Sequence, residues 1–291
     1  MNRANSEICI ILNPSAKGER ARNLADKLRR SLPEARVLLT RYRGHAEELA
    51  RQSVRAEYSK IVAAGGDGTI NEVVNGIAGA RGVALGILPV GTVNVFAMEL
   101  GIPSRMEAAL EIVTNGHTRN LDLARANNRY FVQLAGVGFD AEAVKATDLN
   151  FKKVAGPLSY LLAATQVAAQ KPPLLQIRWD QGHVVEGCFM LVGNGRYYGG
   201  PFQFFPEADM QDGKLDVCVF KKRTHFDLLR YFQGIVSGTH TKFDDVAYFK
   251  ARHISVTADR RVPLEVDGEL AGEIPVEFSI KKQALKVLVP E

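Results

Sequence analysis

The residues best suited to chemistry lie in a glycine-rich segment, IVAAGGDGTINEVVNG, that runs from Ile61 to Gly76. A buried-type apolar run leads directly into Gly65, Gly66, Asp67, Gly68 and Thr69, and a helical pattern follows. Glycines let backbone N–H groups approach phosphate oxygens, and the helix amino terminus adds partial positive charge. A carboxylate in such a loop repels phosphate unless it orients a hydroxyl or a cation bridges them, so Asp67 indicates Mg-nucleotide chemistry. The alternative is a tight strand-to-helix turn with no ligand, since the motif matches neither the Walker nor the dinucleotide pattern.

Two further loops follow strand-like runs in the same half of the chain. The first contains Asn13, Pro14, Ser15, Ala16, Lys17 and Gly18, and the second runs from Pro89 to Asn94. In a doubly wound sheet such loops all emerge at the carboxyl edge of the strands, where ligands bind. Three small or polar loops at one edge are hard to explain as turns alone.

The elements that would position these loops alternate between strand and helix up to about Gly116. Apolar runs predict strands at Ile8–Leu12, Val37–Leu39, Ile61–Ala64 and Val83–Leu88. Helical spacing follows each of them, and a further helix is expected from a capping box at Ser104 and Glu107 to Asn115. Fully apolar strands predict a parallel sheet covered on both faces, so we expect an α/β doubly wound nucleotide-binding domain over residues 1–121.

The second part of the chain has short strand-like runs broken by Gly, Pro and Asn, which predict an antiparallel β-sandwich domain over residues 122–283. The expected strands are Tyr130–Leu134, Leu175–Trp179, Val184–Val192, Leu215–Phe220, His253–Thr257, Val262–Val266 and Val276–Ile280. Two helices are expected, Leu158–Ala169 and Phe226–Val236. The first is apolar nearly all round, so it is either an ordinary buried helix or the lining of a lipid-entry side of the cleft. The strand within 284–291 could belong to either domain.

Two acidic clusters stand out in this β-rich part. Asp209 and Asp212 lie in PEADMQDGKLDV, and Asp267 and Glu269 lie in VDGE. By themselves, the first is typical of a β-turn with Asp caps and the second of a solvated Asp-Gly hairpin. Read as chemistry, the carboxylates could hold a hard cation or accept a proton.

In several segments the chain resembles the diacylglycerol kinase catalytic-domain family, which includes bacterial lipid kinases and sphingoid-base kinases. GGDGTINEVVNG at 65–76 and ILPVGTVNVFA at 87–97 are similar to its two glycine motifs. GVGFDA at 136–141, GNGRYYGG at 193–200, PEADMQDGKLDV at 206–217 and VDGE at 266–269 resemble its later landmarks, in order. GGDGT is shared with NAD kinases, whereas the run from Tyr197 to Val217 is more specific to the lipid kinases.

The resemblance implies an ATP-dependent lipid kinase that phosphorylates a lipid hydroxyl, with ATP and Mg²⁺ as cofactors and diacylglycerol or a related lipid as substrate. It implies that ATP is surrounded by Asn13, Pro14, Ser15, Ala16, Lys17, Thr40, Gly65, Gly66, Asp67, Gly68, Thr69, Ile70, Asn71, Glu72 and Thr92. A structural Mg²⁺ is implied at Asp212, with backbone carbonyls near Asp209 and Lys214. Catalysis is assigned to Glu269, Asp267 and Asp67, and Glu269 is preferred slightly over Asp267 as the base.

The sequence departs from the family pattern in two places. Asn94 is followed by Val95 where the family usually has Asp, and the first loop reads NPSAKG where the family prefers a Ser-Gly pair. Both departures concern nucleotide contacts. Two other classes of function stay open. One is a soluble-substrate kinase of the NAD kinase type, which the landmarks from Tyr197 to Val217 count against. The other is a nucleotide-binding protein without catalysis, which Val95 would allow.

Composition and charge bear on partners and location. The chain has 291 residues and a formal charge of +5, and residues 1–60 hold 13 Lys/Arg against 7 Asp/Glu. A basic first domain suits nucleotide phosphate or an anionic membrane surface, and no nucleic-acid partner is expected. Cys9, Cys188 and Cys218 lie far apart, each in an apolar run. This pattern predicts buried, unpaired cysteines in a protein from a reducing compartment. We expect a cytoplasmic, peripherally membrane-associated enzyme of phospholipid metabolism, since the amino-terminal apolar run is too short for export or spanning. The oligomeric state is left open.

Overall fold

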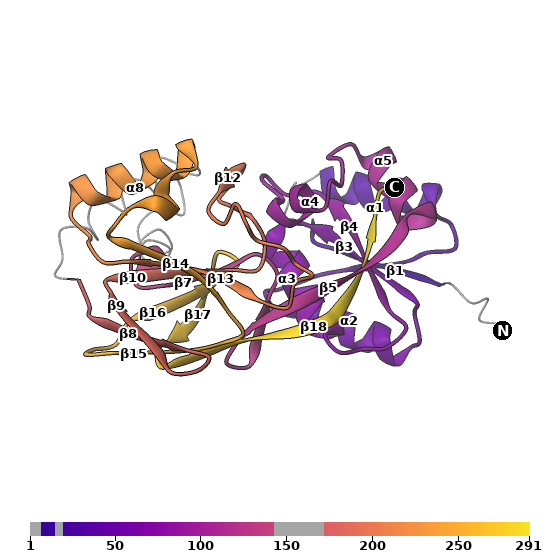
Figure 1. Ribbon diagram of the computed structural model, residues 1–291. Helices are drawn as coiled ribbons and strands as arrows, with labels where there is room; N and C mark the ends of the chain where they lie inside the picture. Colours follow the sequence, from indigo (N-terminus) through magenta and orange to yellow (C-terminus); the bar gives the residue numbers. More distant parts are fainter. Residues whose placement is uncertain (1–6, 15–19, 143–171) are drawn as a thin grey trace. The chain divides into compact units, whose positions relative to one another are not determined.

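A computed structural model describes residues 7–14, 20–142 and 172–291 (Figure 1). The chain divides into two units: residues 1–123 with 282–291, and residues 124–281. Each unit is described separately. The expected helix at 158–169 and the loop residues Ser15, Ala16 and Lys17 lie outside the described ranges.

Unit 1 is built on a parallel sheet in the order β2-β1-β3-β4-β18. Its strands are β1 (Ile8–Leu12), β2 (Arg36–Leu39), β3 (Lys60–Gly65), β4 (Ala84–Pro89) and the last part of β18 (Val276–Val289). The helices are α1 (Arg20–Ser31), α2 (His45–Arg55), α3 (Asp67–Ile77), α4 (Val95–Glu99) and α5 (Met106–Asn115). Figure 1 shows α1 and α5 on one side of the strands and α2 on the other. The predicted α/β doubly wound fold is confirmed.

The apolar strands of unit 1 explain this arrangement. In β1 and β3 every residue from the second onward is buried, as expected for strands that helices cover on both faces. The predicted capping box at the start of α5 is wrong. The helix begins one residue later, after Arg105, without a side-chain cap, and Glu107 instead forms an ion pair with Lys27 at 2.5 Å.

Unit 2 is an antiparallel sandwich, as predicted. One sheet has the order β14-β13-β10-β7-β16-β17, and the facing strands are β18-β15-β8-β9 together with β5 and β6. The first sheet comprises β14 (Val246–Ala251), β13 (Leu215–Phe220), β10 (Phe189–Gly193), β7 (Leu134–Val137), β16 (Pro263–Val266) and β17 (Glu269–Glu273). The other strands are β15 (His253–Ala258), β8 (Leu175–Trp179), β9 (His183–Gly187), β6 (Arg129–Phe131) and the last part of β5 (His117–Ala126), whose first residues belong to unit 1.

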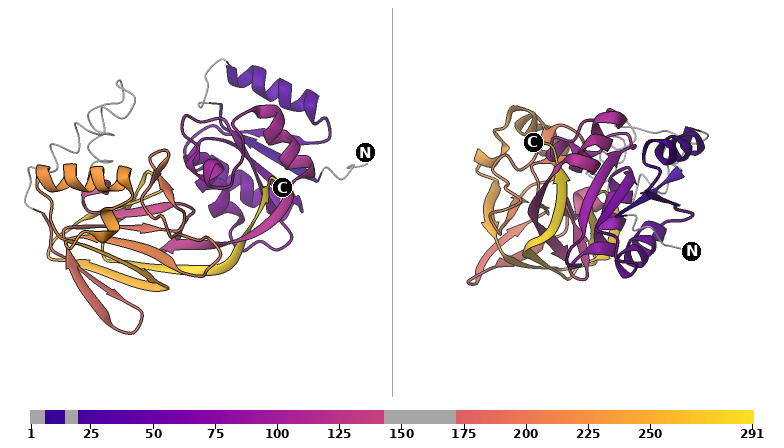
Figure 2. Two further views of the ribbon diagram at one scale, coloured as in Figure 1. Left: turned by 45° about the horizontal axis from the view of Figure 1, so that its top comes forward. Right: turned by 90° about the vertical axis from the view of Figure 1, so that its right-hand side faces the viewer.

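Two hydrophobic clusters hold unit 2 together. The larger lies between the two sheets and includes Met190, Val217, Ile254 and Phe278. The smaller lies on the other face of the six-stranded sheet, where α8 (His225–Ser237) contributes Tyr231. Figure 2 shows α8, in orange, lying outside the strands of this unit. A short hairpin of β11 (Tyr197–Tyr198) and β12 (Phe202–Gln203) completes the unit.

Two predicted strands are divided because the chain changes sheets within them. The run 184–192 contributes β9 to one sheet and β10 to the other, and the change falls at Gly187 and Cys188. The run 130–134 likewise ends β6 and begins β7. Each run is mostly apolar and is interrupted only by Glu186 and Gly187 or by Gln133, so the pattern alone does not show that the chain changes sheets there.

Candidate functional site

The ends of β1, β3 and β4 form one edge of the unit 1 sheet. Leu12 pairs with Ala64, and Gly65 pairs with Pro89, so the three strands end at the same level. The backbone N–H of Asn13 donates to the carbonyl of Ala64 at 2.9 Å. The loops that follow these strands are therefore neighbours, as the parallel topology requires.

The loops after β3 and β4 touch through their backbones. A Cβ added to Gly91 would lie 2.5 Å from the Cα of Gly66, and one added to Gly65 would lie 2.5 Å from the Thr69 side chain. Larger residues are excluded by contact here rather than by the φ angle. Thr69 is held in turn, because the Asn13 amide donates to its hydroxyl at 3.0 Å. The result is a surface of glycine backbone at the amino terminus of α3, which is suited to phosphate groups.

Asp67 joins the start of α3 to the start of α4. Its carboxylate accepts the backbone N–H of Phe96 at 3.3 Å. Burial raises the pKa of the Asp67 carboxyl, and backbone N–H groups that include those of Val95 and Phe96 partly oppose this rise. Asp67 thus anchors α4 at the same edge as the glycines.

Val95 places a buried isopropyl side chain where the family pattern has a carboxylate. Its side chain is only 8% exposed, and its backbone N–H contributes to the environment of Asp67. The preceding Asn94 is held locally, because its amide oxygen accepts from the N–H of Gly91 and its amide nitrogen donates to the Gly91 carbonyl. The departure thus removes a charge while the loop keeps its backbone contacts.

The remaining residues predicted to surround ATP differ in their exposure to solvent and in their contacts. Ile70 is fully buried, and Glu72 uses both carboxylate oxygens to accept the N–H groups of Gly44 and Ala46 at the start of α2, at 2.8 and 3.0 Å. Asn71 and Thr40 are buried, whereas Thr92 is exposed. The structure thus brings Asn13, Gly65, Gly66, Asp67 and Thr69 together at the sheet edge, next to Gly91 and Asn94.

In unit 2, Asp267 and Gly268 form the two-residue turn between β16 and β17. Both have positive φ, 47° and 82°, as a type I′ hairpin requires. The hairpin geometry that the Asp-Gly pair indicates is present. It also places Glu269 at the first position of β17.

The Asp267 carboxylate binds three consecutive backbone N–H groups, those of Val132, Gln133 and Leu134, at 2.9, 2.9 and 3.1 Å. The Asp267 N–H donates to the Leu134 carbonyl at 2.8 Å. The same segment is held from its other side by Asn194, which donates from its backbone to the Gln133 carbonyl and from its side chain to the Val132 carbonyl. Asp267 therefore fixes the segment between β6 and β7.

Glu269 has a different environment. One carboxylate oxygen lies 3.3 Å from a guanidinium nitrogen of Arg129, and the two side chains are 23% and 35% exposed. Glu269 thus remains partly accessible to solvent beside a positive charge. Its contact with Arg129 joins two side chains, whereas the Asp267 carboxylate binds the backbone of residues 132–134.

A buried pair of carboxyl groups, Glu265 and Asp140, lies next to the turn at Asp267 and Gly268. Glu265 is fully buried and Asp140 is 5% exposed. One oxygen of Glu265 accepts the N–H of Gly268 at 2.8 Å, and the Tyr198 hydroxyl donates to Asp140 at 2.9 Å. Burial and the Asp140 charge raise the pKa of the Glu265 carboxyl well above its ordinary value. The two carboxyl groups lie close together, since a Cβ added to Gly136 would lie 2.7 Å from an oxygen of Asp140 and 2.9 Å from an oxygen of Glu265. Burial beside a second carboxyl group favours the neutral form of Glu265.

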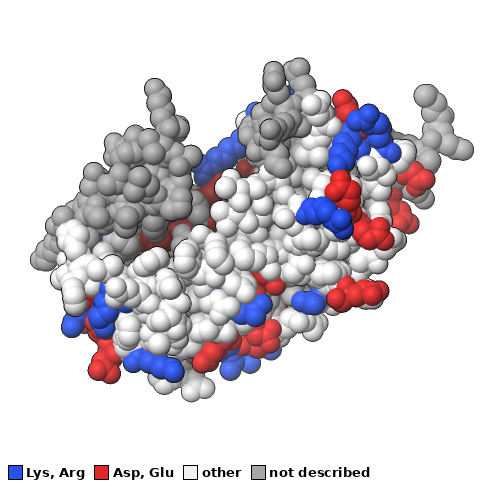
Figure 3. Space-filling model, turned by 90° about the horizontal axis from the view of Figure 1, so that it is seen from above, with Lys and Arg blue, Asp and Glu red and all other residues white. Residues whose placement is uncertain are grey.

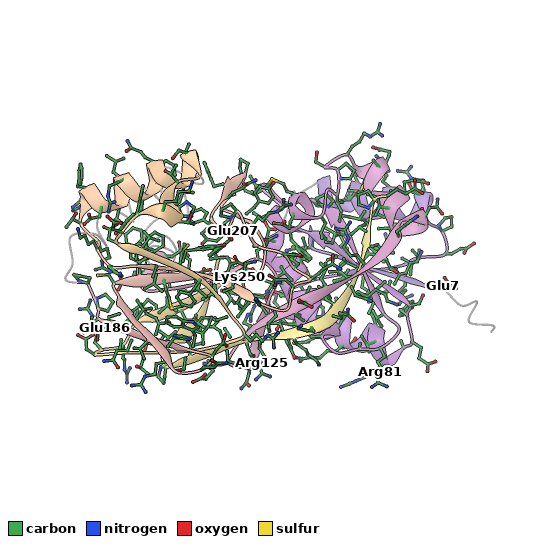
Figure 4. The ribbon with its side chains drawn as sticks, in the orientation of Figure 1. Glu7, Arg81, Arg125, Glu186, Glu207 and Lys250 are labelled. Atoms are coloured by element: carbon green, nitrogen blue, oxygen red, sulfur yellow. The ribbon has the colours of Figure 1, made fainter. Side chains whose placement is uncertain are left out.

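The loop predicted to hold a structural Mg²⁺ surrounds the Lys250 ammonium. Lys250 donates to the Glu207 carbonyl at 2.7 Å and to the Asp212 carboxylate at 2.9 Å, and it lies 3.5 Å from Asp216. Figure 4 shows Lys250 and Glu207 near each other. The second oxygen of Asp212 accepts the Lys214 N–H at 2.8 Å. As placed, these oxygens fit a cation that the chain itself supplies, and a divalent ion would have to displace Lys250 or share Asp212 with it.

Asp216 is the buried member of this group. Burial raises the pKa of its carboxyl, and the Tyr248 hydroxyl and the Lys250 ammonium oppose the rise only in part. Asp209 lies in the same loop and accepts the N–H of Gln211. In the part of the chain that the structure describes, no group of three His, Cys, Asp or Glu side chains is arranged to hold a metal ion.

Sequence reasoning missed four residues of these arrangements: Arg129, Asp140, Lys250 and Glu265. Asp140 lies in a motif singled out for its resemblance, GVGFDA, so that motif could have indicated it. Lys250 lies on β14, where no strand was predicted. No local pattern marks a lysine that meets a loop 38 residues away.

Comparison with known families gives two adjoining matches. Residues 7–126 match the diacylglycerol kinase catalytic domain, and residues 133–289 match the YegS C-terminal NAD kinase beta sandwich-like domain. The first contains the glycine loops of unit 1. The second contains the turn at Asp267 and the loop at Asp212.

Similar proteins match over nearly the whole chain. A diacylglycerol kinase of Staphylococcus haemolyticus is 33% identical over 97% of this chain and 88% of its own length. One of Staphylococcus aureus strain MRSA252 is also 33% identical, over 97% of this chain and 91% of its own. A solved Bacillus anthracis structure, named as a proposed diacylglycerol kinase, superposes with a TM-score of 0.81 at 25% identity, covering 97% of this chain and 94% of its own.

Replacing Lys250 by Met should lower the free energy of unfolding by about 2 kcal/mol or more, because it leaves Asp216 buried without its cation. Urea unfolding of Lys250→Met measures this loss, with Lys221→Met, at an exposed lysine, as the control. Equal stability of the two variants would contradict the role of Lys250. Repeating the urea unfolding in EDTA decides whether a divalent ion shares Asp212. A lower free energy of unfolding of the wild type in EDTA would show that such an ion is bound.

Replacing Glu265 by Gln should preserve the fold, because an amide matches a protonated carboxyl in shape and can still accept the Gly268 N–H. A carboxyl whose pKa is raised on folding stabilises the fold fully below its unfolded pKa, about 4.3, and loses that effect as pH rises through the folded value. Wild-type stability should therefore fall with rising pH relative to Glu265→Gln. Urea unfolding from pH 5 upward measures the difference. Glu265→Ala is the control, and equal losses in both variants would contradict a neutral Glu265.

Proposed function

Because this chain belongs to the diacylglycerol kinase catalytic-domain family, we propose that it transfers the γ-phosphoryl group of ATP to a lipid hydroxyl, with diacylglycerol as the preferred acceptor. The observation that carries the proposal is the match of residues 7–126 to that catalytic domain, within relatives 33% identical over almost the full length. The glycine-backbone edge of unit 1 supports it with a surface of the right chemistry for phosphate.

The residues that would hold ATP are those gathered at this edge. Gly65, Gly66 and Gly91 let the backbone come close to phosphate oxygens, and Asn13 with Thr69 lines the same edge. Bound ATP supplies the phosphoryl group, and the Mg²⁺ that accompanies it neutralises phosphate charge. Glu72 and Ile70 contribute by fixing α2 and α3 rather than by contact with nucleotide.

Glu269 is the proposed base. Phosphoryl transfer needs the hydroxyl proton to be accepted as the new bond forms, and a positioned carboxylate typically contributes about 10²–10⁴-fold. Glu269 is partly exposed, and its charge is balanced by Arg129. Asp267 is the weaker candidate, because three backbone N–H groups already bind its carboxylate and favour its ionised, fixed form.

Glu269→Gln should therefore reduce mainly the turnover number, whereas Asp267→Asn should reduce mainly the stability of the fold. Glu269→Gln should lower kcat by about 10²-fold or more with near-normal stability, because it removes a proton acceptor. Asp267→Asn should lower the free energy of unfolding by about 2 kcal/mol, because an amide oxygen cannot replace both carboxylate oxygens. Steady-state kinetics and urea unfolding on both variants measure this. The reverse pattern, with Asp267→Asn fully folded and inactive, would assign the base to Asp267.

A direct test of the function uses Mg²⁺, γ-labelled ATP and separate lipids in mixed micelles: diacylglycerol, phosphatidylglycerol, a sphingoid base and ceramide. Label should enter the organic phase as phosphatidic acid when diacylglycerol is present. The match of the second domain to an NAD kinase-like sandwich favours one further candidate, so NAD is added as an aqueous acceptor. Labelled NADP without labelled lipid would replace the proposal with that activity. ATP binding without transfer to any acceptor would leave a nucleotide-binding protein.

A further inference from the structure

Helix α8 of unit 2 carries an exposed row of large apolar side chains. Their exposed fractions are 74% for Phe226, 56% for Leu229, 51% for Phe232 and 60% for Val236. The intervals of three, three and four residues place all four on one face of the helix. We call this row the α8 stripe.

The inner face of α8 accounts for the position of the helix. Tyr231 is 2% exposed and packs against the rings of Phe189 and Phe220, and its hydroxyl donates to Asp245 at 3.0 Å. The helix begins with a complete capping box between Thr224 and Asp227. These contacts hold the inner face of α8. The four residues of the stripe stay 51–74% exposed, so packing within the described residues does not explain their apolar character.

The charges around α8 are arranged in a way that suits an anionic surface. The two charged side chains of the helix are used internally: Asp227 caps it, and Arg230 forms ion pairs with Asp227 and Asp245. The other exposed positions on the outer face are His225, Gln233 and Ser237. Two exposed lysines, Lys221 and Lys222, precede the helix. Figure 3, seen from the side on which α8 lies in Figure 1, shows mostly uncharged residues over this part of unit 2.

The stripe continues onto the neighbouring hairpin. The ring of Phe202 on β12 lies 5.8 Å from that of Phe232. The partner strand β11 carries Tyr198, whose hydroxyl binds Asp140 of the buried carboxyl pair. The apolar surface and the support of the Asp267 turn are therefore joined by one short hairpin of unit 2.

We propose that the α8 stripe docks on a lipid bilayer that contains anionic headgroups, with Phe226 and Phe232 entering the interface and Lys221 and Lys222 lying at the headgroups. Isolated apolar side chains are ordinary on a protein surface, but a contiguous row is an interaction site. An apolar helix face with exposed lysines before its first turn is the pattern of an interfacial helix, and of these lysines Lys222 also lies 3.8 Å from Asp245. The proposal rests on the proposed function, because a diacylglycerol hydroxyl lies at a bilayer surface. No helix among the described residues is long and apolar enough to span a bilayer.

The binding test requires no catalysis. The double variant Phe226→Ser/Phe232→Ser is compared with the wild type and with Val184→Ser, which alters a 55% exposed apolar residue of β9 in the same unit. Each protein is sedimented with vesicles of phosphatidylcholine alone and with phosphatidylglycerol added. The wild type and Val184→Ser should bind the anionic vesicles. The affinity of the double variant for the same vesicles should be lower by about tenfold or more. High salt should weaken wild-type binding without abolishing it, because salt screens the lysines and leaves apolar insertion.

Activity measured separately distinguishes docking from function. On a short-chain diacylglycerol below its critical micelle concentration the double variant should match the wild type, and on long-chain diacylglycerol in vesicles it should lose about tenfold or more. A wild type that phosphorylates neither form would refute the proposed function, while the vesicle comparison still tests docking. Equal vesicle binding by the wild type and the double variant would overturn the docking proposal.

Two other occupants of the stripe have their own signatures. A marked fall in the melting temperature of the double variant would show that the chain itself covers the stripe. A wild-type dimer that becomes monomeric in the double variant, with unchanged vesicle binding, would assign the stripe to a second copy of the chain. Either result overturns docking on a bilayer.

Discussion

The Asp267 carboxylate is the contact on which the arrangement of unit 2 depends. Three successive N–H groups of residues 132–134 converge on it, at the point where the chain leaves β6 in one layer and enters β7 in the other. Backbone groups that leave one sheet before joining the next have no ladder partner, and a buried unsatisfied N–H is costly. A single ionised side chain meets this need from a tight hairpin turn. The same turn then places Glu269 at the head of β17.

In unit 1 the two loops at the sheet edge are positioned by close contact between their backbones. In unit 2 the corresponding segment is positioned by a carboxylate. Gly66 and Gly91 approach so closely that a methyl group on Gly91 would overlap the other loop. Neighbouring parallel strands bring the two loops together, and glycine allows the contact. Asp67 then ties α3 to α4 through backbone N–H groups. The substitution of Val95 for the family carboxylate is compatible with this construction, because the backbone at that position, and not its side chain, meets Asp67.

The acidic groups of unit 2 show how neighbouring carboxyls acquire different states. Glu265 is buried beside Asp140, which raises the pKa of its carboxyl, Asp267 accepts three backbone N–H groups, and Glu269 is paired with Arg129. Asp216 and Asp212 share the Lys250 ammonium. Composition alone would count these groups as equivalent. Their surroundings distinguish a buried carboxyl with a raised pKa, a carboxylate that holds the backbone, and a carboxylate that stays accessible to solvent.

The fold class can be predicted from the sequence alone, because buried parallel strands and short antiparallel strands leave different apolar patterns. The glycine segment at 65–69 likewise indicates its own turn. It also indicated the hairpin at Asp267 and Gly268, since few residues adopt positive φ at both positions. The tertiary structure decided which acid faces which partner: Lys250 meets Asp212 across 38 residues, and Asp267 meets Val132 across 135. The tertiary structure also determines that the mostly apolar run 184–192 changes sheets at Cys188, and that β18 pairs with β4 at Val287. Such contacts depend on packing between distant segments, and local periodicity carries no record of them.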